Sequence, residues 1–206
     1  MRKLLMATRN KGKLKELTEL VAPLGIKVLS LDDVEAIPEI IEDGDTFTEN
    51  AIKKARETSK YTGYICLADD SGLVVEALNG LPGIYSARFA GEEADDEANN
   101  RKLLALMQNI KESKRTAYFV SVIALCDTGG NCITVEGKCS GSIALKAKGR
   151  TGFGYDPLFI PSGHSRSFAE FSGEEKNKIS HRGQALNKAI PVIKKLILGE
   201  DDGERI

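Results

Sequence analysis

The chain has 206 residues, of which 41% are hydrophobic and 29% are charged, a balance that excludes an intrinsically disordered protein. Because 29 basic side chains accompany 30 acidic ones and the net charge is −1, the sequence lacks the basic excess typical of proteins that bind duplex nucleic acid. No apolar run approaches the length of about 18 residues that a membrane span needs, and the N-terminal segment soon turns polar. We therefore expect a soluble, cytoplasmic protein with neither a membrane span nor a signal peptide.

Short apolar runs alternate with helical patterns in the first half of the chain. Four of these runs predict β-strands, at residues 3–7, 26–29, 64–68 and 73–78. Apolar residues at helical spacing predict a helix over residues 14–24. The segment TFTE at residues 46–49 has the form of a capping box, so a second helix should begin near Thr46 and end near Gly63. The acidic cluster at residues 92–97 predicts the start of a third helix, because carboxylates stabilise a helix N-terminus.

The second half contains longer strands and ends in a helix. Residues 116–127 and 131–140 are rich in β-forming side chains, and the Thr-Gly-Gly segment between them is typical of a hairpin turn. A short strand is predicted at residues 142–146, and the apolar positions from Leu186 to Ile197 predict the last helix. These elements indicate an α/β protein built on a mixed sheet, with its antiparallel strands in the middle of the sequence.

A chain of this length can bury a core of its own, so it should need neither disulfides nor a structural metal to fold. It shows no internal repeat, low-complexity tract or linker, and we expect residues 1–199 to form one domain and residues 200–206 to form a flexible tail. The cysteines have neither a C-x-x-C spacing nor a nearby histidine. We expect all of them to be buried free thiols: Cys66, Cys126, Cys132 and Cys139.

Polar residues cluster at four places where a predicted strand or helix begins or ends, which is where binding sites usually lie. The first cluster is Thr8, Asn10 and Lys13, between the first strand and the first helix. A helix N-terminus presents N–H groups to an anion and the lysine adds positive charge, so this segment could bind phosphate. The same residues could also serve only to cap the helix, and they lack the spacing of a Walker A loop.

The second cluster is the segment DDSG at residues 69–72, with Glu42 and Asp43 as candidate companions. Adjacent carboxylates at the end of a strand are suitable ligands for Mg²⁺, which prefers oxygen donors. An ionised aspartate beside the metal could also accept a proton from an attacking water. Asp-Ser-Gly is equally typical of an Asx turn, which would make this cluster structural.

The third and fourth clusters follow the long strands. The third, GFGYDP at residues 152–157, holds an aromatic ring between two glycines, which leaves a face of the ring open for stacking on a planar ligand. The fourth comprises Lys176 and SHRG at residues 180–183, whose His and Arg side chains can donate hydrogen bonds to carbonyl or phosphate oxygens. Taken singly, the third could be a tight loop with an inward-facing ring, and the fourth a charged helix entrance.

Five motifs, in order along nearly the whole chain, resemble the inosine triphosphate pyrophosphatase family. They are ATRNKGKLKEL, TFTENAIKKAR, LADDSGLVVEALNGLPGIYSARFAG, GFGYDPLF and KISHRGQAL. The combination of DDSGL, GIYSARF, FGYDP and SHRGQAL is highly specific, and no signature residue departs from the family's pattern.

The resemblance implies an elongated, two-lobed α/β fold with a central mixed sheet, flanking helices and an active site in the cleft between the lobes. It also implies a homodimer that hydrolyses ITP, dITP and XTP to the nucleoside monophosphate and pyrophosphate, with Mg²⁺ as cofactor. Such an enzyme keeps deaminated purines out of DNA and RNA. Its partners would be purine nucleoside triphosphates, with no role for nucleic acid or a membrane.

Carried over by position, the resemblance implies a role for each motif residue. Mg²⁺ would be held by Glu42 and Asp70, with Asp70 also the catalytic base and Asp69 supporting it. The residues implied to bind the substrate are Thr8, Asn10 and Lys13 for the triphosphate, Ser71, the run Phe153, Gly154, Tyr155 and Asp156 for the stacked base, and Lys176, His181 and Arg182 for the purine edge.

The chemistry of the purine indicates how such a site would select its substrate. Hypoxanthine and xanthine carry a 6-keto oxygen that could pair with donors from His181 and Arg182, whereas adenine carries a 6-amino group. A buried unpaired polar group costs about 1–3 kcal/mol, enough to disfavour ATP. Guanine shares the keto group, so its rejection needs a further feature that the motifs do not identify.

Three other functions are compatible with parts of the sequence. A Maf-type nucleotide pyrophosphatase has a related architecture and reaction, but SHRGQAL and FGYDP favour the purine enzymes. A metal-dependent phosphomonoesterase could use Asp69 and Asp70 as nucleophile and partner, but it needs an Asp-x-Asp spacing. A nucleotide-binding regulator would bind without turnover, and the presence of Asp70 together with Glu42 argues against it.

Overall fold

The structure, a computed structural model, describes residues 2–199. Its strands are β1 (Arg2–Met6), β2 (Ile26–Leu29), β3 (Cys66–Val75), β4 (Thr116–Cys126), β5 (Cys132–Ile143) and β6 (Phe159–Pro161). Its longer helices are α1 (Lys11–Val21), α2 (Phe47–Thr62), α3 (Asp96–Leu106), α4 (Gly173–Ile179) and α5 (His181–Ile193). Short helical turns are η1 (Ala22–Leu24), η2 (Glu76–Leu78), η3 (Gly83–Arg88), η4 (Glu112–Lys114), η5 (Phe168–Glu170) and η6 (Lys194–Leu198).

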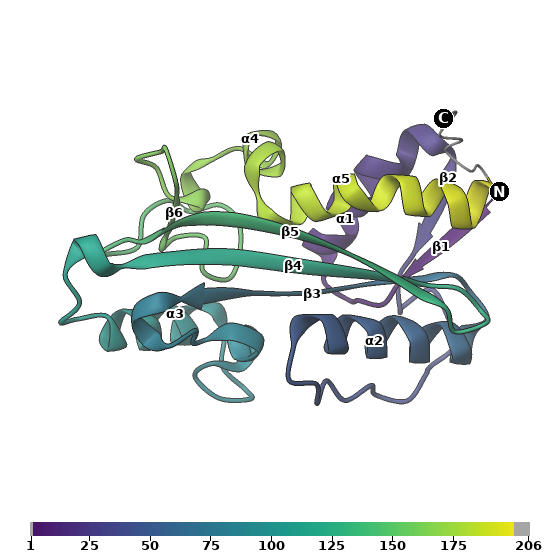
Figure 1. The fold of residues 1–206 in the computed structure, drawn as a ribbon, viewed down its shortest axis with the longest axis horizontal. Helices are drawn as coiled ribbons and strands as arrows, with labels where there is room; N and C mark the ends of the chain where they lie inside the picture. The colour runs from purple at the N-terminus through teal and green to yellow at the C-terminus, as the bar shows by residue number, and fades with distance from the viewer. Residues whose placement is uncertain (1, 200–206) are drawn as a thin grey trace, which may run out of the picture. The chain divides into compact units, whose positions relative to one another are not determined.

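The strands form a mixed sheet in the order β2-β1-β3-β4-β5-β6 (Figure 1). β1 pairs in parallel with both β2 and β3, and Leu5 lies opposite Leu29 on one side and Cys66 on the other. β6 pairs antiparallel with β5, with Ser142 opposite Ile160. The predicted α/β class with a mixed sheet is confirmed.

β3 is one continuous strand, although the sequence predicts two strands separated by the DDSG segment at residues 69–72. Every residue of β3 is buried except the half-buried Ser71 and Val74. Because the chain is covered on both faces here, its polar residues keep the extended backbone and its ladder pairing instead of turning into solvent. The Asx-turn interpretation of this segment is therefore wrong.

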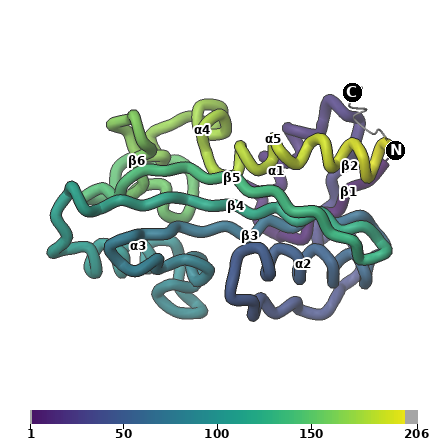
Figure 2. Tube along the Cα trace, viewed as in Figure 1, coloured from purple at the N-terminus to yellow at the C-terminus, as the bar shows by residue number. Residues whose placement is uncertain are grey.

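The predicted hairpin in the middle of the chain is confirmed. β4 and β5 are neighbours in the sheet, and Figure 2 shows them side by side up to the turn that joins them. Within this turn, the Asp127 N–H donates to the Asn131 carbonyl oxygen (3.0 Å), and the Gly130 N–H donates to the Asp127 carbonyl oxygen (3.1 Å). The predicted separate strand at residues 142–146 is wrong: residues 142 and 143 are the end of β5, and residues 144–146 lie beyond the strand.

The expectation of four free thiols is wrong for two cysteines. Cys126 ends β4, Cys132 begins β5, and a disulfide joins them with their Cα atoms 4.1 Å apart. Composition does not reveal this pair, because the register of the hairpin decides which residues face each other. Cys66 and Cys139 are buried thiols as expected, and burial raises the pKa of Cys66 to about 12 and that of Cys139 to about 11.

Helix α2 begins where its capping signal predicts. The Thr46 side chain accepts a hydrogen bond from the Glu49 N–H, and the Glu49 side chain accepts one from the Thr46 N–H, which completes the capping box of α2. Gly63 follows α2 with φ 69°, a left-handed conformation that glycine adopts without strain. The predicted last helix is α5, continued by η6.

The chain divides into two compact units. The described parts of unit 1 lie within Met1–Asp70, Val122–Gly137 and Gln184–Ile206, and unit 2 consists of Ser71–Ser121 and Lys138–Gly183. The prediction that residues 1–199 form a single two-lobed domain stays a prediction. The predicted tail at residues 200–206 lies outside the described residues.

Unit 1 has an aliphatic core between its strands and the helices α1 and α5. The core includes Leu4, Met6, Leu17, Val21, Leu67, Ile123, Leu125, Ala185, Leu186, Ala189 and Ile193. Figure 1 shows α2 on the opposite side of these strands from α5. Both faces of β3 in unit 1 are therefore covered, and its polar side chains lie in enclosed surroundings.

Unit 2 has a core rich in aromatic rings. It includes Leu73, Phe89, Leu103, Met107, Phe119, Tyr155, Phe159, Phe168 and Phe171. α3 lies on one side of the strands of this unit and α4 on the other (Figure 1).

Within residues 2–199, no helix has both the length and the apolar character that crossing a bilayer requires.

Candidate active site

Thr8, Asn10 and Lys13 lie where β1 leads into α1, in unit 1. The Asn10 N–H donates to Thr8 Oγ1 (3.1 Å), and the Lys13 N–H donates to Asn10 Oδ1 (3.1 Å), so both side chains shape the start of the helix. The Lys13 side chain reaches β3, where its Nζ atom lies 3.1 Å from Asp69 Oδ2 and 3.1 Å from the Asp69 carbonyl oxygen. The parallel pairing of β1 and β3 thus brings the first two predicted clusters together.

Asp69 and Asp70 are consecutive residues of β3 and therefore point to opposite faces of the sheet. Asp69 is 5% exposed, and its carboxylate pairs with Lys13. Asp70 is 9% exposed; the charge of Glu42 raises the pKa of its carboxyl group, and the charge of Lys54 lowers it. Glu42, in the connector between β2 and α2, pairs with Lys54 of α2. One aspartate is thus neutralised by a lysine, whereas the other lies under the influence of a second carboxylate.

The Asp70 carboxyl group is poised to accept a cation or a proton. Burial, followed by the negative charge of Glu42, raises the pKa of Asp70 from 3.8 to about 6. The positive charges of Lys54 and Lys13 oppose this rise. Among the described residues, none forms a hydrogen bond with Asp70 Oδ2, which is buried. Such destabilised groups concentrate at functional sites, where a ligand or a reaction uses them.

The carboxylates of Asp70 and Glu42 fit a Mg²⁺ ion. Asp70 Oδ2 is a buried oxygen donor, and the charge of Glu42 already acts on the same carboxyl group. Mg²⁺ is usually bound through one or two carboxylates and keeps several waters, so it needs no larger cluster. Residues 2–199 contain no group of three or more His, Cys, Asp or Glu side chains that could hold a metal ion. A bound cation could replace Lys54 as the positively charged partner of Glu42.

Sequence reasoning did not identify Lys54, although the sequence carries a signal for it. The buried side of α2 includes Ala51 and Thr58, and Lys54 lies three residues after the first and four before the second, which is helical spacing. A helical projection that starts from the Thr46 cap therefore turns this lysine toward the covered side of α2. Its partner Glu42 lies in a connector without regular structure, whose path the sequence does not reveal.

In unit 2, Asp156 and Lys176 form a buried ion pair. The Lys176 Nζ atom lies 2.6 Å from Asp156 Oδ2, and the two side chains are 10% and 3% exposed. The same Oδ2 atom accepts a hydrogen bond from the Phe153 N–H (3.0 Å). Lys176 therefore holds the GFGYDP loop through Asp156, and its Nζ atom lies 4.9 Å from the centroid of the Phe153 ring.

The first residues of α5 lie in the same part of unit 2. The Arg182 guanidinium carbon lies 5.3 Å from the centroid of the Phe153 ring, and Arg182 Nη2 donates to Ser71 Oγ (3.0 Å). His181 is buried and stacks on Phe119, with the ring centroids 4.5 Å apart and an interplanar angle of 11°. The third and fourth predicted clusters are thus brought together, with two cationic groups close to the half-buried Phe153 ring.

The two glycines beside Phe153 are required by the backbone. Gly152 and Gly154 have φ 80° and 61°, and a Cβ atom on Gly152 would lie 2.1 Å from Asp156 Oδ2. Tyr155 is 4% exposed, and its hydroxyl donates to the Ser86 carbonyl oxygen (2.8 Å). The structure therefore places Tyr155 in the core of unit 2, although it belongs to the run predicted to contact substrate.

The chain is similar in sequence to known proteins over nearly its whole length. The model of the Ham1 family matches residues 4–192. A protein of Desulforamulus reducens named dITP/XTP pyrophosphatase is 51% identical over 199 residues, which cover 97% of this chain and 99% of the relative. A protein of the same name from Geobacter sulfurreducens is 51% identical over 186 residues, 90% of this chain and 94% of the relative.

Solved structures show the same similarity in three dimensions. A HAM1 protein from Coxiella burnetii superposes with a TM-score of 0.87 and 42% identity, over 95% of this chain and 100% of the other. A nucleoside-triphosphatase, dITP/XTP pyrophosphatase, from Mycobacterium abscessus superposes with a TM-score of 0.77 and 48% identity, over 92% and 99% of the two chains. These matches confirm the resemblance found in the five motifs, and the chain belongs to the Ham1 family.

Proposed function

We propose that the protein hydrolyses ITP, dITP and XTP to the nucleoside monophosphate and pyrophosphate. The observation that carries this proposal is Asp70, a buried carboxylate with a raised pKa, on which the negative charge of Glu42 and the positive charge of Lys13 both act. The names of relatives that share about half of their residues with this chain support it. Metal-bound carboxylates beside a lysine are suited to binding and cleaving a polyanionic phosphate chain.

The triphosphate would be bound by unit 1. Asp70 and Glu42 would hold Mg²⁺, which when bound supplies positive charge to the phosphate oxygens and acidifies a bound water. Lys13 would add a second positive charge, and Asp69 would orient it through the ion pair that the two residues form. Thr8 and Asn10 would contact the phosphates from the start of α1, where backbone N–H groups favour anions.

Asp70 would act as the general base. A pKa of about 6 leaves its carboxylate ionised at neutral pH while keeping it more basic than an ordinary aspartate. The oxygen of the attacking water forms a bond to phosphorus, and its proton passes to Asp70. The anhydride link between the α and β phosphates opens at the attacked phosphorus, the electron pair of the broken bond goes to the bridging oxygen of the departing group, and the products are the nucleoside monophosphate and pyrophosphate.

The purine base would be bound by unit 2. Phe153 would stack on the base beside Ser71, and Asp156 would keep the Phe153 backbone in place through its hydrogen bond. Lys176, His181 and Arg182 would offer donors to the 6-keto oxygen of hypoxanthine or xanthine. The 6-amino group of adenine would leave such donors unpaired, which is the physical reason to expect discrimination against ATP. The same family resemblance supports a homodimer that acts in the cytoplasm on purine nucleoside triphosphates.

The substrate and metal requirements can be measured together. In Mg²⁺ buffer, kcat/KM for ITP should exceed that for ATP by about 5- to 150-fold, the equivalent of one unpaired buried polar group of about 1–3 kcal/mol. Excess EDTA should abolish turnover of ITP, and added Mg²⁺ should restore it. Equal rates with ITP and ATP, or full activity in EDTA, would contradict the proposal.

A further inference from the structure

Two side chains of α3 bind both polar groups of the Gly154 backbone. The Gly154 N–H donates to Asp96 Oδ2 (2.6 Å), and Asn100 Nδ2 donates to the Gly154 carbonyl oxygen (2.9 Å). Asp96 and Asn100 are four residues apart and therefore lie on one face of the helix. Asp96 and Asn100 lie outside the motifs from which the site was predicted, and the function described above does not use them.

The contacts fix the residue that follows the stacking ring. The backbone of Phe153 is held on both sides. Its own N–H donates to Asp156 Oδ2 (3.0 Å), and the N–H of the next residue, Gly154, donates to Asp96 of α3. Tyr155, the next residue along, is anchored in the core of unit 2 through its hydroxyl. The backbone on either side of the Phe153 side chain is therefore fixed, and α3 supplies the fixed point on the C-terminal side.

α3 is itself firmly attached to unit 2. Asn99 Oδ1 accepts a hydrogen bond from the Ala90 N–H (2.7 Å), and Asn99 Nδ2 donates to the Ala87 carbonyl oxygen (3.0 Å). Leu103 is fully buried in the aromatic core, and Asp95 caps the helix by accepting a hydrogen bond from the Ala98 N–H (2.7 Å). The helix can therefore serve as a rigid support for the loop.

The stability of α3 does not explain why position 100 is an asparagine. Within the described residues, Asn100 Oδ1 is buried and has no hydrogen-bond partner. A buried, unpaired amide oxygen is destabilising, whereas a leucine of similar size would carry no polar atom into this position. The hydrogen bond that Asn100 donates to Gly154 is the contact that accounts for the amide.

We propose that Asp96 and Asn100 are positioning residues for the nucleobase, which hold the loop of Phe153 in the conformation that stacks on the purine. The inference rests on the proposed function, because it assumes that Phe153 binds the base. When the loop samples other conformations, the apparent affinity for substrate equals the intrinsic affinity multiplied by the fraction of time that the competent conformation is populated. The phosphates and the reacting atoms are bound by other residues, so the chemical step should be spared.

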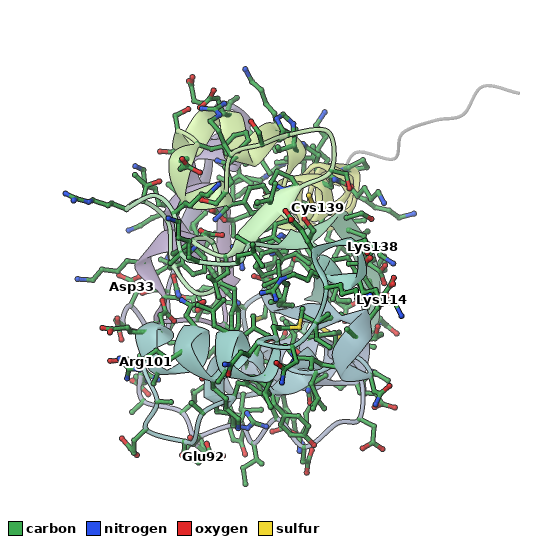
Figure 3. All side chains as sticks on the ribbon, turned by 90° about the vertical axis from the view of Figure 1, so that its left-hand side faces the viewer. Asp33, Glu92, Arg101, Lys114, Lys138 and Cys139 are labelled. Atoms are coloured by element: carbon green, nitrogen blue, oxygen red, sulfur yellow. A yellow bond between two sulfur atoms is a disulfide. The ribbon has the colours of Figure 1, made fainter. Side chains whose placement is uncertain are left out.

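Steady-state kinetics of four variants test the proposal. Asp96→Ala and Asn100→Leu should each raise KM for ITP about three- to tenfold, the range expected for one hydrogen bond, with kcat within about twofold of wild type. Inorganic triphosphate, which lacks a base, should compete with ITP, and its Ki should be the same in these variants as in the wild type. Asp96→Asn keeps an acceptor oxygen and should restore most of the affinity. The matched control is Glu97→Gln on the same helix, because Glu97 forms an exposed ion pair with Arg101, which is labelled in Figure 3.

Hydrogen exchange of residues 152–156 provides a second readout. Asp96→Ala should speed exchange of the Gly154 amide, whose acceptor it removes, and Glu97→Gln should leave that amide unchanged. The proposal is overturned when the KM for ITP in Asn100→Leu matches that of wild type, or when kcat falls while KM does not. A parallel rise in the Ki of inorganic triphosphate would also overturn it, because the damage would then be global. Failure of the wild-type chain to hydrolyse ITP would instead refute the proposed function, and the exchange measurement would still test the contacts.

Discussion

Asp70→Asn is expected to lower kcat for ITP by at least about 10²–10⁴-fold, the usual contribution of a general base. Asparagine cannot take the proton of the attacking water, and it replaces a carboxylate ligand of Mg²⁺ with a neutral amide. The fold should be preserved because the two side chains have nearly the same size. Phosphate release coupled through added inorganic pyrophosphatase measures the effect, and unchanged turnover would remove Asp70 from the mechanism.

The same substitution should raise the stability of the metal-free protein, in a pH-dependent manner. Asp70 titrates near 3.8 in an unfolded chain and at about 6 in the folded one, so folding favours its protonated form. Below about pH 3 the wild-type side chain is neutral in both states, so the two proteins should be equally stable there and still differ little at about pH 4. As the pH rises to about 6, the ionisation of Asp70 lowers the free energy of unfolding of the wild type. Above that pH the variant should be more stable than the wild type by about 2–3 kcal/mol.

Denaturant unfolding in EDTA at about pH 4 and about pH 7.5 measures this difference. Asp43→Asn is the matched control, because Asp43 is exposed and its hydrogen bond with Lys53 lowers the pKa of its carboxyl group. Removing that favourable charge should not stabilise the protein at about pH 7.5. A variant Asp70→Asn that is less stable than wild type at this pH would contradict the origin assigned to the raised pKa.

Asp156→Ala is expected to destabilise the protein by about 3–5 kcal/mol, because it leaves the buried Lys176 ammonium without its partner. It also removes the acceptor for the Phe153 N–H, so ITP binding should weaken together with stability. Denaturant unfolding of the wild type and the variant gives the free-energy difference. A loss below about 1 kcal/mol would show that the ion pair is solvated like a surface pair.

A double variant separates the two effects of this ion pair. Asp156→Ala combined with Lys176→Met removes the stranded charge and should recover much of the lost stability. It should not recover affinity for ITP, since the loop still lacks its acceptor and the base still lacks the lysine donor. Recovery of both properties by the double variant would exclude a role for this pair in nucleobase binding.

Local signals predicted much of the fold. The capping box at Thr46 and the stop at Gly63 gave the bounds of α2 almost to the residue, because both depend on hydrogen bonds within a few residues. β3 was divided wrongly because its polar residues resemble a turn, and only the layers on both faces keep it extended. The disulfide between Cys126 and Cys132 escaped prediction because it depends on the register of the hairpin.

The candidate site was predictable in its motif residues but not in the contacts between them. Asp69 and Asp70 were grouped as one acidic cluster, whereas the strand directs them to opposite faces. Lys54 and Glu42 come together only through the path of an irregular connector. Asp96 and Asn100 reach Gly154 from more than 50 residues away in sequence, and neither belongs to a motif that suggests binding. Such long-range contacts require the tertiary structure.

The most direct test of the account is to identify the phosphorus products formed from ITP and Mg²⁺ by ³¹P NMR. The expected products are IMP and pyrophosphate, with no inorganic phosphate until a pyrophosphatase is added, because the link between the α and β phosphates is the one cleaved. Formation of IDP and inorganic phosphate would contradict it, since the γ phosphate would then be the group removed.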